Sequence, residues 1–260
     1  MIEEKRLRMV RAGHAEVRQD EPCRWLLRVD PTHEGYSDAQ IDDCHGVPRS
    51  RFPWRPPVRL SLRARVGPDL PLGTFGFGFW NDPFSLAMGQ AGAGWRLPTL
   101  PRAIWFFYGS PPNDFAFIPG QPGSGWKAMS LESPRLPALL LAPAALAGFG
   151  LLQIPGLRTL AIRSALRMVT ASEAPIPLVP GEWHDYVLHW KRDRSTFCVD
   201  GVPVLDAEFP PRSPLGFVAW IDNQFAVLSP RAGLRFGVIP TRTAQLLEIE
   251  HLRIESRDEQ

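Results

Sequence analysis

The stretch Gly73–Phe84, GTFGFGFWNDPF, decides the fold. Side chains of a β-strand point alternately to its two faces, so the phenylalanines share one face, and the glycines share the other with Trp80. We expect the phenylalanines to fill a core between two sheets. The opposite face forms a shallow trough beside Trp80, where a ring-shaped ligand or a neighbouring segment can approach the backbone. The first set is Phe75, Phe77 and Phe79, and the second is Gly76, Gly78 and Trp80.

Alternation with a period of two recurs along the chain. In Val58–Val66, VRLSLRARV, every second residue is apolar and the residues between are Arg or Ser, which is typical of a half-exposed antiparallel strand. The pair Asp200-Gly201 favours a two-residue hairpin turn. The other strand candidates are Cys23–Asp30, Ser37–Cys44, Ala103–Ser110, Asp114–Pro119, Trp126–Leu131, Trp183–Trp190, Ser195–Phe209, Gly216–Ser229, Leu234–Ile239 and Leu246–Glu255.

Composition agrees with one large all-β domain. The chain has 260 residues with 28 Pro and 22 Gly, which suits many short strands and turns. We expect a single sandwich domain over 23–260 after an N-terminal arm, 1–22. A net charge of +2 lacks the basic excess of a nucleic-acid binder, so no such partner is expected. Three cysteines without CxxC spacing and an N-terminus without an apolar signal core predict a cytoplasmic protein.

One segment departs from the strand pattern. Leu136–Leu157 is almost free of polar groups, and Leu157–Val169 alternates apolar residues with Arg at helical spacing. We therefore expect a helical insertion over about 136–170, too short in its apolar part for a membrane span. Two interpretations stay open. The insertion is a flap packed on the sandwich, or residues 136–169 form a basic amphipathic lid in peripheral contact with a membrane or an apolar substrate.

Four stretches together resemble a known superfamily. They are Gly73–Phe84, the hairpin Trp183–Val204 (WHDYVLHWKRDRSTFCVDGVPV), Gly216–Gln224 and the closing Leu247–Glu255. Their order is similar to that of the concanavalin A-like lectin/glucanase superfamily, and within it to family 16 glycoside hydrolases. The resemblance runs from about Cys23 to Glu255. It implies an all-β jelly-roll sandwich of two curved antiparallel sheets, with the ligand on the concave face.

The chain departs from this family at the catalytic strand. In the hydrolases the strand after the Phe-Trp strand carries Glu-x-Asp-x-x-Glu, and period-two geometry places all three carboxylates on the concave face. The corresponding stretch here, Ala103–Ser110, is AIWFFYGS and has no carboxylate. The three glutamates of the closing strand lie where the family has no catalytic groups. Family 16 hydrolysis is therefore not expected.

The most acidic stretch, Ser37–His45, offers other polar groups. On a strand, Asp38, Gln40 and Asp42 point the same way. They would line the cleft, hold a hard cation such as Ca²⁺, or form a solvated face bonded to nearby arginines. Apart from this Ca²⁺ alternative, no cofactor and no metal site are expected.

Further candidates follow the two aromatic strands. Asn81 and Asp82 either build the turn after Trp80 or form the rim of a cleft. Tyr108 is a candidate for proton transfer with Asp114. The candidate ligand-binding residues are Trp80, Asn81, Asp82, Trp105, Tyr108, Asp38, Gln40 and Asp42, and the catalytic candidates are Asp38, Asp42, Asp82 and Tyr108.

Three functional hypotheses remain, and whether the protein is an enzyme is left open. In the first, aromatic rings and Asn/Asp groups bind a glycan or glycoside without family 16 hydrolysis. In the second, an intracellular enzyme or binding protein holds a hydrophobic small molecule, a lipid or terpenoid, under the apolar flap. In the third, a glycoside hydrolase uses relocated carboxylates. The resemblance favours the first.

Overall fold

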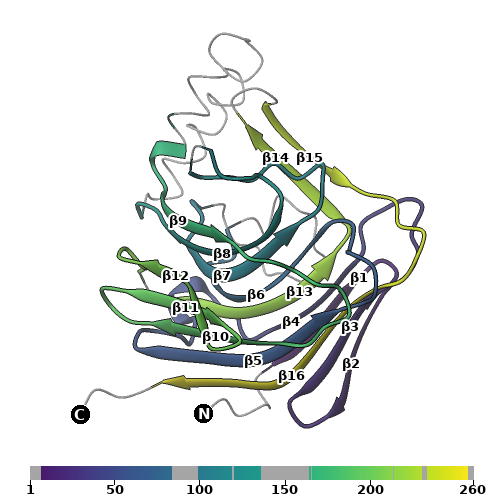
Figure 1. Cartoon of the computed structure of the whole chain (residues 1–260), viewed down its shortest axis with the longest axis horizontal. Helices are drawn as coiled ribbons and strands as arrows, with labels where there is room; N and C mark the ends of the chain where they lie inside the picture. Colours follow the sequence, from purple (N-terminus) through teal and green to yellow (C-terminus); the bar gives the residue numbers. More distant parts are fainter. Residues whose placement is uncertain are drawn as a thin grey trace.

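The computed structural model describes residues 7–83, 99–118, 120–135, 164, 166–212, 214–229 and 233–256. These residues form two antiparallel sheets of seven strands each, sheet A and sheet B, and a separate two-stranded ribbon. The two sheets stack face to face as a jelly-roll β-sandwich, as the sequence predicts (Figure 1). Within the described part of the chain, no helix has the length and apolar character needed to cross a bilayer.

Each sheet combines strands from distant parts of the chain. Sheet A has the order β1 (Arg8–Ala12), β4 (Asp38–Asp42), β13 (Gly216–Asp222), β6 (Thr74–Trp80), β7 (Ala103–Gly109), β8 (Gly125–Glu132) and β9 (Thr170–Pro175). Sheet B has the order β12 (Val202–Ala207), β11 (Ser195–Val199), β10 (His184–Trp190), β5 (Val58–Val66), β16 (Gln245–Ser256), β3 (Arg24–Val29) and β2 (Ala15–Glu21). The ribbon pairs β14 (Gln224–Ser229) with β15 (Gly233–Val238), and Arg49–Arg51 form one 3-10 turn.

The core between the sheets is the predicted one. Phe75, Phe77 and Phe79 of β6 are buried there, as is the apolar side of β5. Facing them from sheet B, Tyr186 packs edge-on against Phe77, with ring centroids 5.0 Å apart. The arginines of β5 remain on the outer side of sheet B. The alternation in the two opening stretches therefore predicts correctly which face each strand buries.

The N-terminal residues correct one expectation. They do not form an arm ahead of the sandwich, because β1 pairs with β4 in sheet A and β2 pairs with β3 in sheet B. Both are edge strands with largely exposed side chains, so their sequence lacks the apolar alternation of an inner strand. The short edge strand β9 is not predicted either, because its one buried residue is the charged Glu173.

Two further expectations concern the middle of the chain. The strand expected over Asp114–Pro119 is not found in its described residues, 114–118; Asp114 makes an isolated bridge to Val227 of the ribbon. The helical insertion expected over 136–170 lies mostly outside the described residues. Of that range, Ser164, Leu166 and Arg167 are helical, and Thr170 already begins β9. The predicted membrane contact of residues 136–169 likewise falls mostly outside the described part.

Candidate functional site

The outer face of sheet A, turned away from sheet B, holds the candidate site. Trp105 of β7 stands opposite Gly78 of β6, and Trp220 of β13 stands opposite Gly76. A Cβ atom on Gly76 would lie 2.8 Å from the Trp220 ring, and one on Gly78 would lie 2.6 Å from Cβ of Trp105. Both positions require glycine because the neighbouring strands and Trp220 approach β6 this closely. The trough predicted from the sequence is filled by the chain's own tryptophans.

Four aromatic side chains gather on this face, and we call Trp80, Trp105, Phe107 and Trp220 the aromatic floor. The rings of Trp80 and Trp220 are nearly parallel, at an interplanar angle of 8° and a centroid distance of 6.4 Å. Trp105 lies between 5.3 and 6.1 Å from these two rings. Trp105 and Trp220 are 8% exposed, whereas Trp80 is half-buried. Trp80 is thus the most accessible of the three indoles.

The indole N–H groups of the floor differ in their partners. Nε1 of Trp220 donates to Oγ1 of Thr74 at 2.9 Å. Nε1 of Trp80 and Nε1 of Trp105 are buried and have no hydrogen-bond acceptor among the described residues. An unsatisfied buried donor costs about 1–3 kcal/mol, so each of these groups calls for an acceptor beyond the residues that the structure describes.

A row of polar side chains lies beside the floor. Asp38, Gln40 and Asp42 of β4 point to the outer face, in register with Asp222, Trp220 and Val218 of β13; we call these three β4 residues the polar row. Nε2 of Gln40 donates to Oδ2 of Asp42 at 2.7 Å. The backbone N–H groups of Cys44 and His45 donate to the other Asp42 oxygen at 2.9 and 2.6 Å. The geometry thus orients Asp42 and Gln40 firmly beside Trp220.

Asp38 has a different environment. It is 1% exposed, neither carboxyl oxygen has a hydrogen-bond partner in the part of the chain that the structure describes, and it stands opposite Asp222, which is 4% exposed. Burial raises the pKa of Asp38 well above its ordinary value, and repulsion from Asp222 and Asp42 acts in the same direction. Burial also raises the pKa of Asp222 to about 7, although hydrogen bonds from Gln224 and Thr74 oppose the rise. Sequence reasoning did not identify Asp222 as a site residue.

The remaining predicted site residues lie elsewhere. Tyr108 points into the core, where its ring stacks on Phe75 at 4.7 Å, so it is not on the face of Trp105. Burial raises the pKa of Tyr108. The Asn81 side chain accepts from the N–H of Arg102 and donates to the carbonyl of Leu100, which joins the two ends of the segment after β6.

Asp82 takes the turn conformation that one of the two interpretations predicts. Its φ is +46°, it is buried, and its carbonyl accepts a hydrogen bond from Arg49. Among the predicted residues, the structure therefore brings together Trp80, Trp105 and the polar row, and leaves Asn81, Asp82 and Tyr108 in supporting positions.

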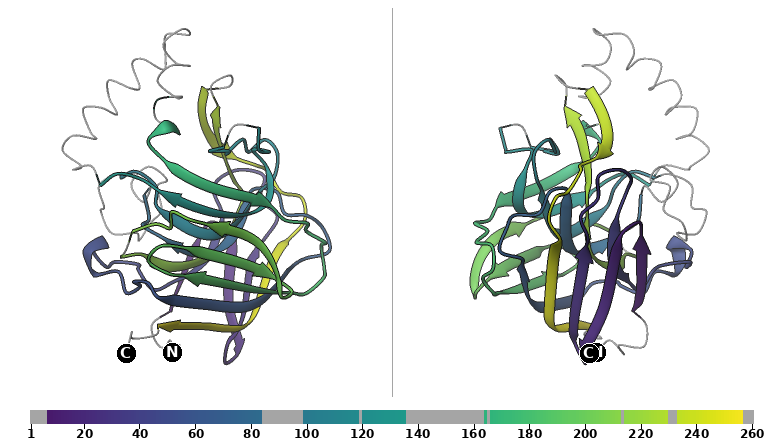
Figure 2. Two further views of the ribbon diagram at one scale, coloured as in Figure 1. Left: turned by 60° about the vertical axis from the view of Figure 1, so that its left-hand side comes forward. Right: turned by 90° about the vertical axis from the view of Figure 1, so that its right-hand side faces the viewer.

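Two segments lie over one end of the aromatic floor, and we call them together the wall. It consists of the loop between β7 and β8 (110–118 and 120–124) and the β14–β15 ribbon, which rises from the end of β13 (Figures 1 and 2). The N–H of Asp114 donates to the carbonyl of Ala226 at 3.1 Å, and the N–H of Ala226 donates to Oδ1 of Asn113 at 2.9 Å. Phe115 of the loop packs on Phe107 of the floor.

A buried ion pair holds this loop on sheet A. Nζ of Lys127 lies 2.9 Å from Oε2 of Glu173, and both side chains are fully buried. Lys127 also donates to the carbonyls of Phe115 and Pro122, at 3.1 and 2.7 Å. The other Glu173 oxygen accepts from the N–H groups of residues 117 and 118, both at 2.7 Å. Every polar atom of the pair is satisfied, so the pair positions the loop and is not free to act on a ligand.

β7 presents no acid on this face. Its outward residues are Ala103, Trp105, Phe107 and Gly109. A metal centre is equally unsupported: among the residues described, no three His, Cys, Asp or Glu side chains converge to hold an ion. The described residues therefore give no support to the Ca²⁺ site considered from the sequence, which stays a prediction.

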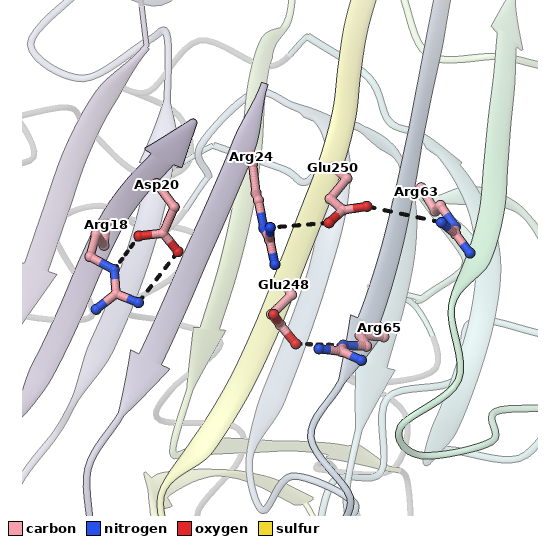
Figure 3. A network of polar contacts seen from close by, with 7 residues as sticks. All are labelled: Arg18, Asp20, Arg24, Arg63, Arg65, Glu248 and Glu250. Carbon is pink, nitrogen blue, oxygen red and sulfur yellow. Dashed lines mark hydrogen bonds and ion pairs between the residues drawn. The ribbon is translucent and has the colours of Figure 1, made fainter. Parts of the chain in front are cut away.

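The outer face of sheet B serves as a contrast. Figure 3 shows Glu250 between Arg24 and Arg63, at 3.4 and 4.0 Å, while Glu248 pairs with Arg65. Trp183 lies against the guanidinium groups of Arg63 and Arg65. The charges of these partly exposed pairs largely compensate one another, so each pair contributes about 0–1 kcal/mol to stability.

Comparisons with known proteins find only distant structural similarity. In sequence it matches no protein-family model and no curated protein. Solved structures with similar architecture include LamA from Zobellia galactanivorans in complex with laminaritriose and laminaritetraose (TM-score 0.49, 11% identity, 97% of this chain and 93% of that one). A legume lectin-like domain from Entamoeba histolytica has a TM-score of 0.48 and 8% identity, over 98% of this chain and 91% of that one. A sialidase has a TM-score of 0.44 and 9% identity over 98% of this chain. The chain spans 17% of the length of that sialidase. Similarity this low carries no functional conclusion.

Proposed function

We propose that this protein binds a glycan or glycoside on the outer face of sheet A. The observation that supports this function is the aromatic floor lying beside the polar row. Sugar rings present apolar C–H faces, which pack on indole rings, and hydroxyl groups, which accept and donate hydrogen bonds. The two indole N–H groups without acceptors in the described part of the chain, on Trp80 and Trp105, suit hydroxyl oxygens. Asp42 and Gln40 supply acceptors and a donor next to Trp220.

The same geometry argues against family 16 hydrolysis. That reaction needs two carboxyl groups that flank the scissile bond, and the family supplies them from one strand. Here β7 presents Ala103, Trp105 and Phe107 instead. The protein therefore acts, in this proposal, as a recognition domain that retains the aromatic half of a glucanase cleft without its acids.

The test is affinity electrophoresis of the full chain in gels that contain a soluble β-glucan, a galactan or alginate. We expect retardation by at least one polysaccharide. W80A should weaken binding about tenfold, the effect of losing about 1.4 kcal/mol of contact with the most exposed indole. W183A removes a tryptophan of similar burial that directly precedes β10 of sheet B, and serves as the matched control. Absence of binding to every glycan, or equal losses in both variants, would refute the proposal.

A second candidate ligand is a hydrophobic small molecule. Around the floor the outer face continues with apolar side chains, namely Ala103, Met129, Leu131 and Val218. An apolar ligand would change the fluorescence of Trp80 but would gain nothing from the polar row. Binding of anilinonaphthalene sulfonate that survives Q40A and is not displaced by any saccharide would favour this candidate over the glycan.

A further inference from the structure

The base of the wall depends on Asp222, the last residue of β13. Its Oδ1 accepts three hydrogen bonds: from the N–H of Thr74 at 3.1 Å, from Oγ1 of Thr74 at 2.8 Å, and from the N–H of Gln224 at 3.0 Å. Thr74 is the first residue of β6 and Gln224 is the first residue of β14. One carboxyl group thus joins the ribbon to the middle of sheet A.

Asn223 joins the same base to the start of β4. Its Oδ1 accepts from the N–H of Ser37 at 2.8 Å, and its Nδ2 donates to the carbonyls of Gly35 and Ile239 at 3.0 and 3.2 Å. Ile239 directly follows β15, and Ser37 directly precedes Asp38. Both ends of the ribbon are therefore bonded within one or two residues of the Asp38–Asp222 pair.

The pair itself tolerates only a limited charge. Asp38 and Asp222 face one another across β4 and β13, almost without solvent contact, and Asp38 receives no hydrogen bond from any described residue. Two ionised carboxyl groups in such a place would repel one another in a medium of low dielectric constant. A proton on Asp38 removes this repulsion. The closed wall is therefore compatible with a protonated pair and strained by an ionised one.

Among the residues described, no neighbouring cation offsets this charge. On the same strand, Asp42 is a third carboxyl group, and its repulsion adds to that of Asp222. From β1, Ala12 stands opposite Asp38, and the only basic residue in register on this side is Arg8, opposite Asp42. On β8, the charge of Lys127 is already paired with that of Glu173. The ion pairs found within the described ranges include none with Asp38 or Asp222.

We propose that Asp38 and Asp222 form a pH-sensitive latch at the base of the wall, closed while the pair holds a proton and released when both carboxyl groups ionise. Release moves the β14–β15 ribbon, and with it the loop that Asn113 and Asp114 bond to Ala226. Since Phe115 of that loop packs on Phe107, opening the wall uncovers the aromatic floor. The latch is a property of the fold and does not require that the ligand be a glycan.

The direction of the pH effect follows from linkage. The pKa values of both groups are raised by burial in the closed state, so the closed state binds protons more tightly than an open, hydrated state. The closed state is favoured at low pH, and it loses stability as the pH rises from about 4, the ordinary value, towards the raised pKa of about 7 for Asp222. Between these limits, release of one proton makes opening about tenfold easier per pH unit.

The test is hydrogen exchange of the full chain, followed by mass spectrometry from about pH 5 to pH 8 and corrected for intrinsic exchange rates. We expect the protection of the β14–β15 amides to fall by about tenfold or more per pH unit up to about pH 7. D38N/D222N, in which both amides imitate the protonated carboxyl groups, should remove the pH dependence. D38N alone should reduce it.

D206N is the matched control, because Asp206 is an exposed aspartate of sheet B and should leave the wild-type profile unchanged. Ribbon protection that does not vary with pH in the wild-type protein would overturn the latch, whether or not the variants fold. So would a profile in D38N that equals the wild-type one. Either result leaves the proposed glycan binding untouched, since that binding is measured separately with W80A.

Discussion

Replacing Lys127 by methionine tests whether the buried ion pair holds the wall's loop. In the wild-type protein the Lys127 ammonium group bonds to Oε2 of Glu173 and to the carbonyls of Phe115 and Pro122. K127M keeps the length of the side chain and removes all three donors. Glu173 then remains as a buried carboxylate without a cation, held only by two backbone N–H groups.

The size of the effect follows from this loss. Breaking a buried pair by removing one partner costs about 3–5 kcal/mol, because the remaining charge is desolvated without compensation. We expect K127M to lower the free energy of unfolding by about that amount. K127M/E173Q removes the stranded charge, and the side-chain amide oxygen that E173Q introduces can still accept from the N–H groups of Phe117 and Ile118. We therefore expect the double variant to be more stable than K127M, although it carries one more substitution.

Urea denaturation followed by tryptophan fluorescence measures the free energy of unfolding of the wild-type protein, of K127M and E173Q, and of the double variant. K191M serves as the control, because Lys191 is exposed and its loss should change stability by less than about 0.5 kcal/mol. A cost below about 1 kcal/mol for K127M would refute the reasoning. So would a double variant whose destabilisation equals the sum of the two single ones, since the charges would then not interact.

Three further predictions concern backbone and burial. G78A should cost about 3 kcal/mol or more in urea denaturation, because φ is +151° and the added Cβ would lie 2.4 Å from the Ile104 carbonyl oxygen. G201A, at a hairpin turn with φ of +78° and no atom within 4 Å, should cost only about 1 kcal/mol; equal costs would contradict the steric argument. Burial raises the pKa of Asp43 to about 7, so wild-type stability should fall as the pH rises from about 4 to about 7, and D43N should show a shallower fall; parallel curves would contradict this.

The sequence predicts the fold where one face of a strand is strictly apolar. The phenylalanines of β6 and the alternation in β5 are such cases, because burial against the opposite sheet selects one side-chain type at every second position. It fails at the edge strands β1, β2 and β9, because the side chains of β1 and β2 are largely exposed and the one buried side chain of β9 is the charged Glu173, so local pattern carries no core signal. The Asp200-Gly201 turn is confirmed, with positive φ at both residues.

The candidate site is predicted only in part. Period-two geometry places Asp38, Gln40 and Asp42 on one face, and the structure confirms that arrangement. Trp220 of β13 completes the site. It lies 146 residues along the chain from its hydrogen-bond partner Thr74, and nothing in a single sequence predicts that β13 pairs with β6. One local signal was available: Lys127 is the only charged residue within the apolar run WKAM of β8, and a lone cation there indicates a buried partner.

The strand order within the sheets has a consequence for how the protein is made. β4 and β6 meet only through β13, and β3 and β5 meet only through β16, so strands from the first third of the chain are joined by strands near its C-terminal end. During synthesis the early strands must wait, with open hydrogen-bonding edges, until the whole of β16 has left the ribosome. Contacts of such sequence separation slow folding, and unpaired edges favour aggregation. Nascent chains of this protein should therefore depend on chaperones until the final strand is released, and fragments that stop before β16 should be insoluble.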